Sequence, residues 1–271
     1  MHIPQRAQVL VLLLTFSCAS LAQRLSAKHA QLELISQQSA AVPGEQLWLG
    51  VHFILEKGWH IYWVNPGDSG QPPVFQWQLP PGFVAGEIQW PRPEKMQHSQ
   101  MADYGYHDET LLLLPVQTPK QSPKNQRINI GANARWLICR DVCIPDHAHL
   151  QLSVPMAENA ADDPKVAPLF IRTKQLLPKP LPTAWRARAE SRETKVVLTL
   201  TTGKSVTSAE FFPLEENQIE GGAAQEVSAK PAGVQITLQK SDQLLHPISR
   251  LKGVLVLSGK AYAVEAPVTE H

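Results

Sequence analysis

Two cysteines, Cys139 and Cys143, stand four residues apart where a predicted strand ends. Residues 127–136 lead directly into the pair and have the alternating apolar side chains of a β-strand. A disulfide here would close a loop of about five residues and stabilise the fold by about 2 kcal/mol, against about 3 kcal/mol for a loop of about 15 residues. So short a bridge stabilises the fold little and forms only with a particular backbone geometry. The spacing therefore favours a labile, exchangeable disulfide.

Two arginines stand beside the pair, Arg135 before it and Arg140 inside it. A nearby cation favours the thiolate, which is the attacking species in thiol-disulfide exchange. The residues alone also allow an unreactive, structural disulfide that fixes the conformation of the loop. The spacing is not the Cys-x-x-Cys of thioredoxin-like proteins, so that motif does not decide between the two interpretations.

The first residues predict an export signal, residues 1–22. Arg6 is followed by the apolar run Val9–Leu14 and by Ser20-Leu21-Ala22, a small-x-small cleavage site. Cleavage after Ala22 would remove the third cysteine, Cys18; a lipoprotein signal at Cys18 is the alternative, which the phenylalanine two residues earlier fits poorly. No later apolar run approaches the roughly 20 residues that a membrane helix needs. We therefore expect a soluble, exported protein in a compartment where disulfides persist.

The charge balance excludes some classes of partner. Signal removal takes one basic and no acidic residue from 25 Lys+Arg and 24 Asp+Glu, which leaves a chain close to neutral. Nothing therefore indicates a nucleic-acid or anionic-membrane partner. There is no glycine-rich phosphate loop, zinc-type cysteine quartet or Ser-His-Asp signature, and we expect no cofactor.

Short alternating segments with proline and glycine between them predict a mainly β chain. The first predicted domain, residues 23–155, has predicted strands at 30–36, 47–55, 74–79, 111–116 and 149–154. Residues 156–184 predict a linker, with a helix over Val166–Leu177 followed by the proline-rich Pro178–Pro182. The second predicted β-domain, residues 185–271, has predicted strands at 195–201, 233–238, 253–257 and 261–264.

Four motifs in the first domain carry a family resemblance. They are Gly58-Trp59-His60-Ile61-Tyr62-Trp63, Asn65–Pro73, Ile88–Pro93 with Tyr104-Gly105-Tyr106, and Trp136–Pro145. In this order, over residues 28–155, they resemble the N-terminal periplasmic domain of the DsbD/ScsB family of thiol:disulfide interchange proteins. The Cys-x-x-x-Cys-Ile-Pro run is most similar to the ScsB-like branch. Whole family members continue into a membrane domain and a thioredoxin-like domain, and we expect neither here.

The resemblance implies an immunoglobulin-like β-sandwich, followed in this chain by the helical linker and the second small β-domain. It also implies a periplasmic protein of protein-disulfide reductase type, in which Cys139 and Cys143 pass electrons to oxidised partners and Cys143 is the attacking sulfur. A Cys143→Ser variant would then leave Cys139 to trap mixed disulfides. Because the sequence offers no second cysteine pair and no flavin or nicotinamide motif, re-reduction requires a membrane reductase acting in trans. The alternative is a non-enzymatic exported binding module with a structural disulfide.

Two further segments have a structural and a functional interpretation. Met96, His98 and Met101 place two thioethers and an imidazole within six residues, a donor set that suits copper(I). An ordinary polar loop is the alternative there, although some relatives similar to this chain are linked to copper tolerance. The segment Asn65–Pro73, which we name the cap loop, is either a plain turn or a cover over the cysteines, as in the family.

Overall fold

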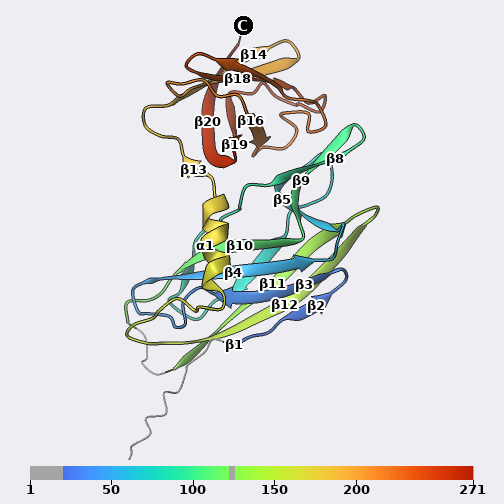
Figure 1. Ribbon diagram of the computed structural model, residues 1–271. Coiled ribbons are helices and arrows are strands. Elements are labelled where there is room, and N and C mark those ends of the chain that lie inside the picture. Colours follow the sequence, from blue (N-terminus) through green and yellow to red (C-terminus); the bar gives the residue numbers. More distant parts are fainter. Residues whose placement is uncertain (1–20, 122–125, 271) are drawn as a thin grey trace, which may run out of the picture.

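The computed structural model describes residues 21–121 and 126–270. In this part of the chain the strands form two β-regions joined by one helix, and Figure 1 shows the first in blue to green and the second in orange to red. The predicted signal peptide lies outside the described residues, except for Leu21 and Ala22. These two residues form strand β1 (Leu21–Ala22) and pair with residues 152 and 153.

The first β-region consists of two antiparallel sheets that enclose one apolar core, which confirms the predicted sandwich. The first sheet runs in the order β1, β12 (Cys143–Pro155), β11 (Arg127–Cys139), β5 (His60–Gly67), β9 (Met101–His107) and β8 (Glu94–His98), with β6 (Val74–Gln78) paired to β11. The second sheet runs in the order β2 (Leu25–Ala27), β3 (Ala30–Ser36), β4 (Gln46–Leu55), β10 (Glu109–Gln117) and β7 (Val84–Ala85).

Side-chain alternation explains why the two sheets pack face to face. In β12, Leu150, Leu152 and Val154 are buried, while the intervening His149 and Gln151 are exposed. Successive side chains of a strand point to opposite faces, so one face of β12 joins the core and the other faces outward. Each buried leucine or valine contributes about 1.5–3 kcal/mol through removal of apolar surface from water. The six strands predicted in this region are confirmed as β3, β4, β6, β10, β11 and β12.

No alternating pattern in the sequence predicts β5, β8 and β9, which form one end of the first sheet. Strand β5 ends in Asn65-Pro66-Gly67, residue types that are common in turns. Its pairing with β9 shifts register between Tyr62 and Gly67. Such an irregular strand lacks the clean alternation on which a sequence-based prediction depends.

The linker contains helix α1 (Ala167–Leu176), within one residue of the predicted Val166–Leu177 at each end. Its Phe170 is fully buried, in a small cluster with Leu111 and other residues of the second sheet. Gly50 makes this contact possible, because a Cβ there would lie 2.5 Å from Leu111 Cδ1 and 3.2 Å from the Phe170 ring. No helix of the described chain is long and apolar enough to span a membrane.

The second β-region is one sheet, as predicted for a small β-domain. Its order is β16 (Ala209–Pro213), β19 (Arg250–Leu257), β20 (Lys260–Glu270), β14 (Arg186–Arg192), β15 (Lys195–Thr201), β18 (Gly233–Gln239) and β17 (Glu226–Lys230), with β13 (Lys179–Pro180) paired to β20. The strands predicted here are confirmed as β15, β18, β19 and β20.

The two β-regions share an aromatic contact. Phe212 of β16 lies edge-on to Trp63 of β5 and Tyr104 of β9, with ring centroids 6.5 Å and 5.3 Å away. All three side chains are almost completely buried. The second β-region therefore packs against the sheet end formed by β5 and β9. The domain boundaries at residues 155 and 184 stay predictions.

Candidate active site

The two cysteines close a β-hairpin. Cys139 is the last residue of β11 and Cys143 the first of β12, and the two stand opposite each other in the strand register. They form a disulfide, with their Cα atoms 4.2 Å apart. Cys139 is buried at 2% exposure, whereas Cys143 is exposed. Only one of the two bonded residues is therefore open to a partner.

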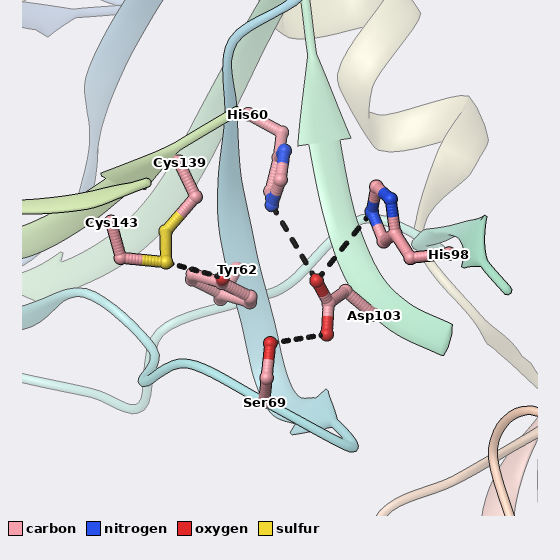
Figure 2. Close-up of a disulfide and its surroundings, with 7 residues drawn as sticks. All are labelled: His60, Tyr62, Ser69, His98, Asp103, Cys139 and Cys143. Atoms are coloured by element: carbon pink, nitrogen blue, oxygen red, sulfur yellow. Dashed lines mark hydrogen bonds and ion pairs between the residues drawn. A yellow bond between two sulfur atoms is a disulfide. The ribbon is translucent and has the colours of Figure 1, made fainter. Parts of the chain in front are cut away.

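The hydroxyl of Tyr62 lies 3.3 Å from Sγ of Cys143 (Figure 2). A disulfide sulfur carries no proton, so the phenol is the donor. The Tyr62 side chain is fully buried, and this burial raises its pKa above the usual value of 10.0. Tyr62 therefore stays protonated at neutral pH and presents a fixed hydrogen-bond donor to the exposed end of the disulfide.

Two histidines and one aspartate converge beside Tyr62, as Figure 2 shows. Asp103 Oδ2 lies 3.8 Å from His60 Nε2 and 3.7 Å from His98 Nε2, while Asp103 Oδ1 accepts a hydrogen bond of 2.7 Å from Ser69 Oγ. His60 and Asp103 are buried, and His98 is half exposed. Burial lowers the pKa of His60, and the Asp103 carboxylate only partly opposes this effect. His60 is therefore neutral near pH 7.

All these groups lie on the outer face of the first sheet. His60 and Tyr62 alternate with the core residue Ile61, and Asp103 precedes the core residue Tyr104. Cys139 stands opposite His60 across the β11–β5 pairing, which places both side chains on the same face. The sequence places none of these neighbours together, because the contacts depend on the register between strands far apart in the chain.

The cap loop covers this face. Gly70 has φ of +81°, and a Cβ at this position would lie 2.1 Å from the Tyr62 ring. The loop therefore lies directly on Tyr62, and only glycine permits so close an approach. Loop residues Gln71 and Pro72 also line a groove of about 680 Å³, whose other walls include Trp136 and Pro145 of the cysteine hairpin.

The second β-region holds the cap loop in place. The buried Asn65 donates hydrogen bonds to the carbonyls of Pro213 (2.9 Å) and Glu215 (3.3 Å). Asp68 accepts hydrogen bonds from the amides of Gly221 (3.2 Å) and Ala102 (2.7 Å). The bonds to Pro213, Glu215 and Gly221 join residues about 150 positions apart, and no sequence pattern indicates them.

The arginines beside the cysteines have other contacts. The Arg140 guanidinium lies 5.1 Å from the centre of the Trp59 ring, and its Nε donates to the Asp141 carboxylate at 2.9 Å. Both members of this ion pair are more than half exposed. The neighbouring carboxylate therefore offsets part of the positive charge that the sequence places next to the thiols.

The candidate copper ligands Met96, His98 and Met101 all lie in the β8–β9 hairpin. His98 stands opposite Met101, and Met96 stands opposite Asp103. Because opposed residues and alternate residues share a face, these four side chains emerge on one side of the hairpin. Copper binding by them stays a prediction, as do the assigned roles of the cysteines.

The comparisons with known proteins agree with this geometry. Residues 31–155 match the family model described as the N-terminal domain of the thiol:disulfide interchange protein DsbD. The crystal structure of the N-terminal periplasmic domain of ScsB from Proteus mirabilis matches with a TM-score of 0.71 and 16% identity, and it covers 94% of this chain and 100% of that chain. At this identity the likeness shows the fold alone, but it includes both β-regions.

Other solved structures are much less similar. The periplasmic chaperone SfaE has a TM-score of 0.22 at 11% identity and covers 88% of this chain and 100% of its own. The YadV chaperone has a TM-score of 0.23 at 12% identity and covers 86% of this chain and 98% of its own. Neither likeness carries an argument, and no curated protein matches the chain. The family match contains the whole cysteine hairpin, and residues 31–155 are therefore similar to the N-terminal domain of the thiol:disulfide interchange protein DsbD.

Proposed function

We propose that this chain is a periplasmic thiol-disulfide exchange protein whose Cys139–Cys143 pair passes electrons to oxidised partner proteins. The unequal burial of the two cysteines carries the proposal. Exchange requires one sulfur that an external thiolate or disulfide can reach and a second sulfur close enough to resolve the mixed disulfide. An exposed Cys143 opposite a buried Cys139 meets both requirements. The periplasmic location follows the ScsB domain to which the chain is similar.

The reaction begins from the reduced pair. The Cys143 thiolate attacks one sulfur of a partner disulfide, and the partner's other sulfur leaves as a thiolate and takes up a proton. Cys139 then loses its proton and attacks Sγ of Cys143, which forms the intramolecular disulfide and releases the second partner thiol. The partner gains two electrons and two protons, and the Cys139–Cys143 pair loses them.

The surroundings of Cys143 support this assignment. The Tyr62 hydroxyl, 3.3 Å from its sulfur, can donate to the thiolate and stabilise it as a nucleophile and as a leaving group. The groove lined by Gln71, Pro72 and Pro145 lies beside the hairpin and offers room for an extended partner segment. The exposed Val142, with 63% of its surface accessible, adds an apolar contact at the hairpin tip.

Repeated turnover needs a source of electrons. The only other cysteine in the sequence, Cys18, lies in the predicted signal peptide. We propose that a membrane reductase acts in trans and reduces the pair by attack on Cys143. In cells, the pair should then be partly reduced, and it should become fully oxidised when the donor is deleted. Thiol trapping in both strains measures this, and a pair that is fully oxidised in the parent strain would contradict the need for a donor.

A redox titration tests the exchange function itself. The purified protein should equilibrate with a glutathione or thioredoxin buffer and show an intermediate reduction potential. A bridge that stays oxidised below about −300 mV would behave as a structural disulfide. That result would favour the alternative, an exported binding module without exchange activity.

A second candidate function is copper(I) binding. It is favoured by the strand register, which places the thioethers of Met96 and Met101 on the same hairpin face as the imidazole of His98. These soft donors suit copper(I). Such a site would be compatible with either the exchange function or the binding-module alternative.

A further inference from the structure

We propose that His60, His98 and Asp103 form a binding site for a divalent transition-metal ion of the zinc class. One donor atom from each residue lies within 4.8 Å of the other two. The three residues come from three different strands, β5, β8 and β9. Figure 2 shows both imidazoles directed at the same carboxylate.

The spacing leaves room for an ion between the groups. The two histidine–carboxylate distances of 3.8 Å and 3.7 Å are too long for hydrogen bonds. Zinc binds nitrogen and oxygen donors at about 2.0–2.2 Å, so neighbouring donors of a tetrahedral site stand about 3.3 Å apart. The histidine–carboxylate distances therefore need to shorten by about 0.5 Å, and the distance between the two imidazole nitrogens, which lie within 4.8 Å of each other, by up to about 1.5 Å. His98 ends β8 beside the two-residue turn and is half exposed, so its side chain is free to move inward.

His60 supplies an independent observation that points to a ligand at this cluster. Its residue is 5% exposed, and among the described residues its Nε2 has no hydrogen-bond partner. A buried polar atom normally has a partner, because its desolvation is otherwise uncompensated. The Asp103 carboxylate lies 3.8 Å from this nitrogen, which is too far for a hydrogen bond. A metal ion would accept the nitrogen lone pair and compensate for the burial.

Asp103 is already oriented for this role. Its Oδ1 accepts the hydrogen bond from Ser69 Oγ at 2.7 Å, which leaves Oδ2 directed at both histidines. Hydrogen bonds of this kind to the second oxygen of a ligand carboxylate hold it in position and strengthen metal binding. The cap loop therefore contributes to the site through Ser69 without supplying a ligand.

The donor set points to zinc-class ions. Two imidazoles and one carboxylate occur as the three protein ligands of catalytic zinc sites, which keep a further position open. Nitrogen and oxygen donors are harder than the thioethers that suit copper(I). The site differs from the copper hypothesis in its ligands, because only His98 is common to both.

The test is a zinc titration of the full chain in competition with a chromophoric chelator. The Cys139–Cys143 disulfide is kept intact, so that thiolates do not contribute. We expect one zinc ion per chain. The His98→Ala and Asp103→Asn variants should each bind at least about 10-fold more weakly, since the loss of even an outer-sphere partner has an effect of this size. Zinc should also raise the melting temperature of the wild type and leave that of His98→Ala unchanged.

The matched control is His107→Ala. His107 lies on the same sheet face, and its side chain is 45% exposed against 50% for His98, but it is not part of the cluster. Zinc affinity should be unchanged in this variant and in the Met96→Leu, Met101→Leu double variant. Equal affinities of the wild type and the folded His98→Ala variant would overturn the proposal. Copper(I) binding that depends on the methionines, without zinc binding, would also overturn it.

Discussion

The hydroxyl of Tyr62 contacts Sγ of Cys143 at 3.3 Å, although the two residues are 81 positions apart in the chain. The contact joins the buried outer face of β5 to the exposed start of β12. It links the environment of the disulfide to a group that the cap loop covers. The surroundings of the disulfide therefore include residues that are remote in the sequence.

Removal of the Tyr62 hydroxyl should lower the reactivity of the Cys143 thiol in the reduced protein. A hydrogen bond to a charged group contributes about 1.5–3 kcal/mol, so Tyr62→Phe should lower the rate of Cys143 with a thiol reagent roughly tenfold or more at neutral pH. The fold should remain, because the buried ring is kept. Tyr106→Phe is the control, since its hydroxyl donates to the Pro91 carbonyl at 2.8 Å. Equal rates for Tyr62→Phe and the wild type would show that the contact has no role in reactivity.

The two cysteine variants should behave differently. Cys139→Ser leaves the exposed Cys143 without its resolving partner, so it should accumulate mixed disulfides with partner proteins. Cys143→Ser should abolish exchange and trap little, because Cys139 is only 2% exposed. This burial revises the expectation from sequence that Cys139 would trap partners. Both variants should stay folded, since the short loop contributes only about 2 kcal/mol. Non-reducing gels and urea unfolding measure both properties, and an unfolded Cys143→Ser would favour a structural bridge.

Loss of the cap-loop anchor should destabilise the protein. Asn65→Ala leaves the carbonyls of Pro213 and Glu215 without their donor, which should lower the free energy of unfolding by about 1–3 kcal/mol. A looser cap loop should also allow faster reduction of the disulfide by a small thiol. The control is Asn129→Ala, an exposed position on β11 where a change within about 0.5 kcal/mol is expected. Equal stabilities of the two variants would show that the second β-region does not hold the loop.

His60 should make the fold sensitive to acid. Burial lowers its pKa below the usual value of 6.5, against the opposing charge of Asp103 and with smaller lowering effects of His98 and His107. Below about pH 6.5 the unfolded chain therefore binds protons that the folded chain does not, and stability falls until the folded pKa is reached. His60→Gln should flatten the pH dependence of urea unfolding in this window. A slope equal to that of the wild type would exclude His60 as its source.

His107 provides a comparison of opposite sign. Its hydrogen bond to Asp108, together with Glu94, raises its pKa above 6.5. The stability from this group is fully present below pH 6.5 and is lost as the pH rises through the folded pKa. His107→Gln should therefore lower the free energy of unfolding below about pH 6.5 and have a smaller effect at higher pH. His60→Gln should instead change the pH dependence on the acid side, where the wild type loses stability as the pH falls.

The copper hypothesis has its own measurement. If Met96, His98 and Met101 bind copper(I), the Met96→Leu, Met101→Leu double variant should have a lower copper(I) affinity than the wild type. Competition with a copper(I) chelator measures this affinity. Leucine keeps the apolar volume, so the change removes the sulfur donors with little effect on packing. Equal copper(I) affinity of the variant and the wild type would remove this hairpin as the copper site.

The sequence alone determined the features that are local along the chain. The alternation in residues 149–154 predicts β12 because a strand buries every second side chain, and helix α1 follows from its own apolar spacing and the prolines around it. The cysteine pair and its neighbouring motifs were also sufficient to indicate the similarity to the DsbD N-terminal domain, while exchange at Cys139 and Cys143 stays a prediction.

Only the tertiary structure decided which remote residues surround that site. Tyr62 reaches Cys143, and His60 meets Asp103, through the pairing of β5 with β11 and β9. The irregular register of β5, and the hydrogen bonds of Asn65 to the second β-region, have no local signature. Strand register depends on the packing of whole sheets, and a shift of one residue would send every side chain of β5 to the opposite face.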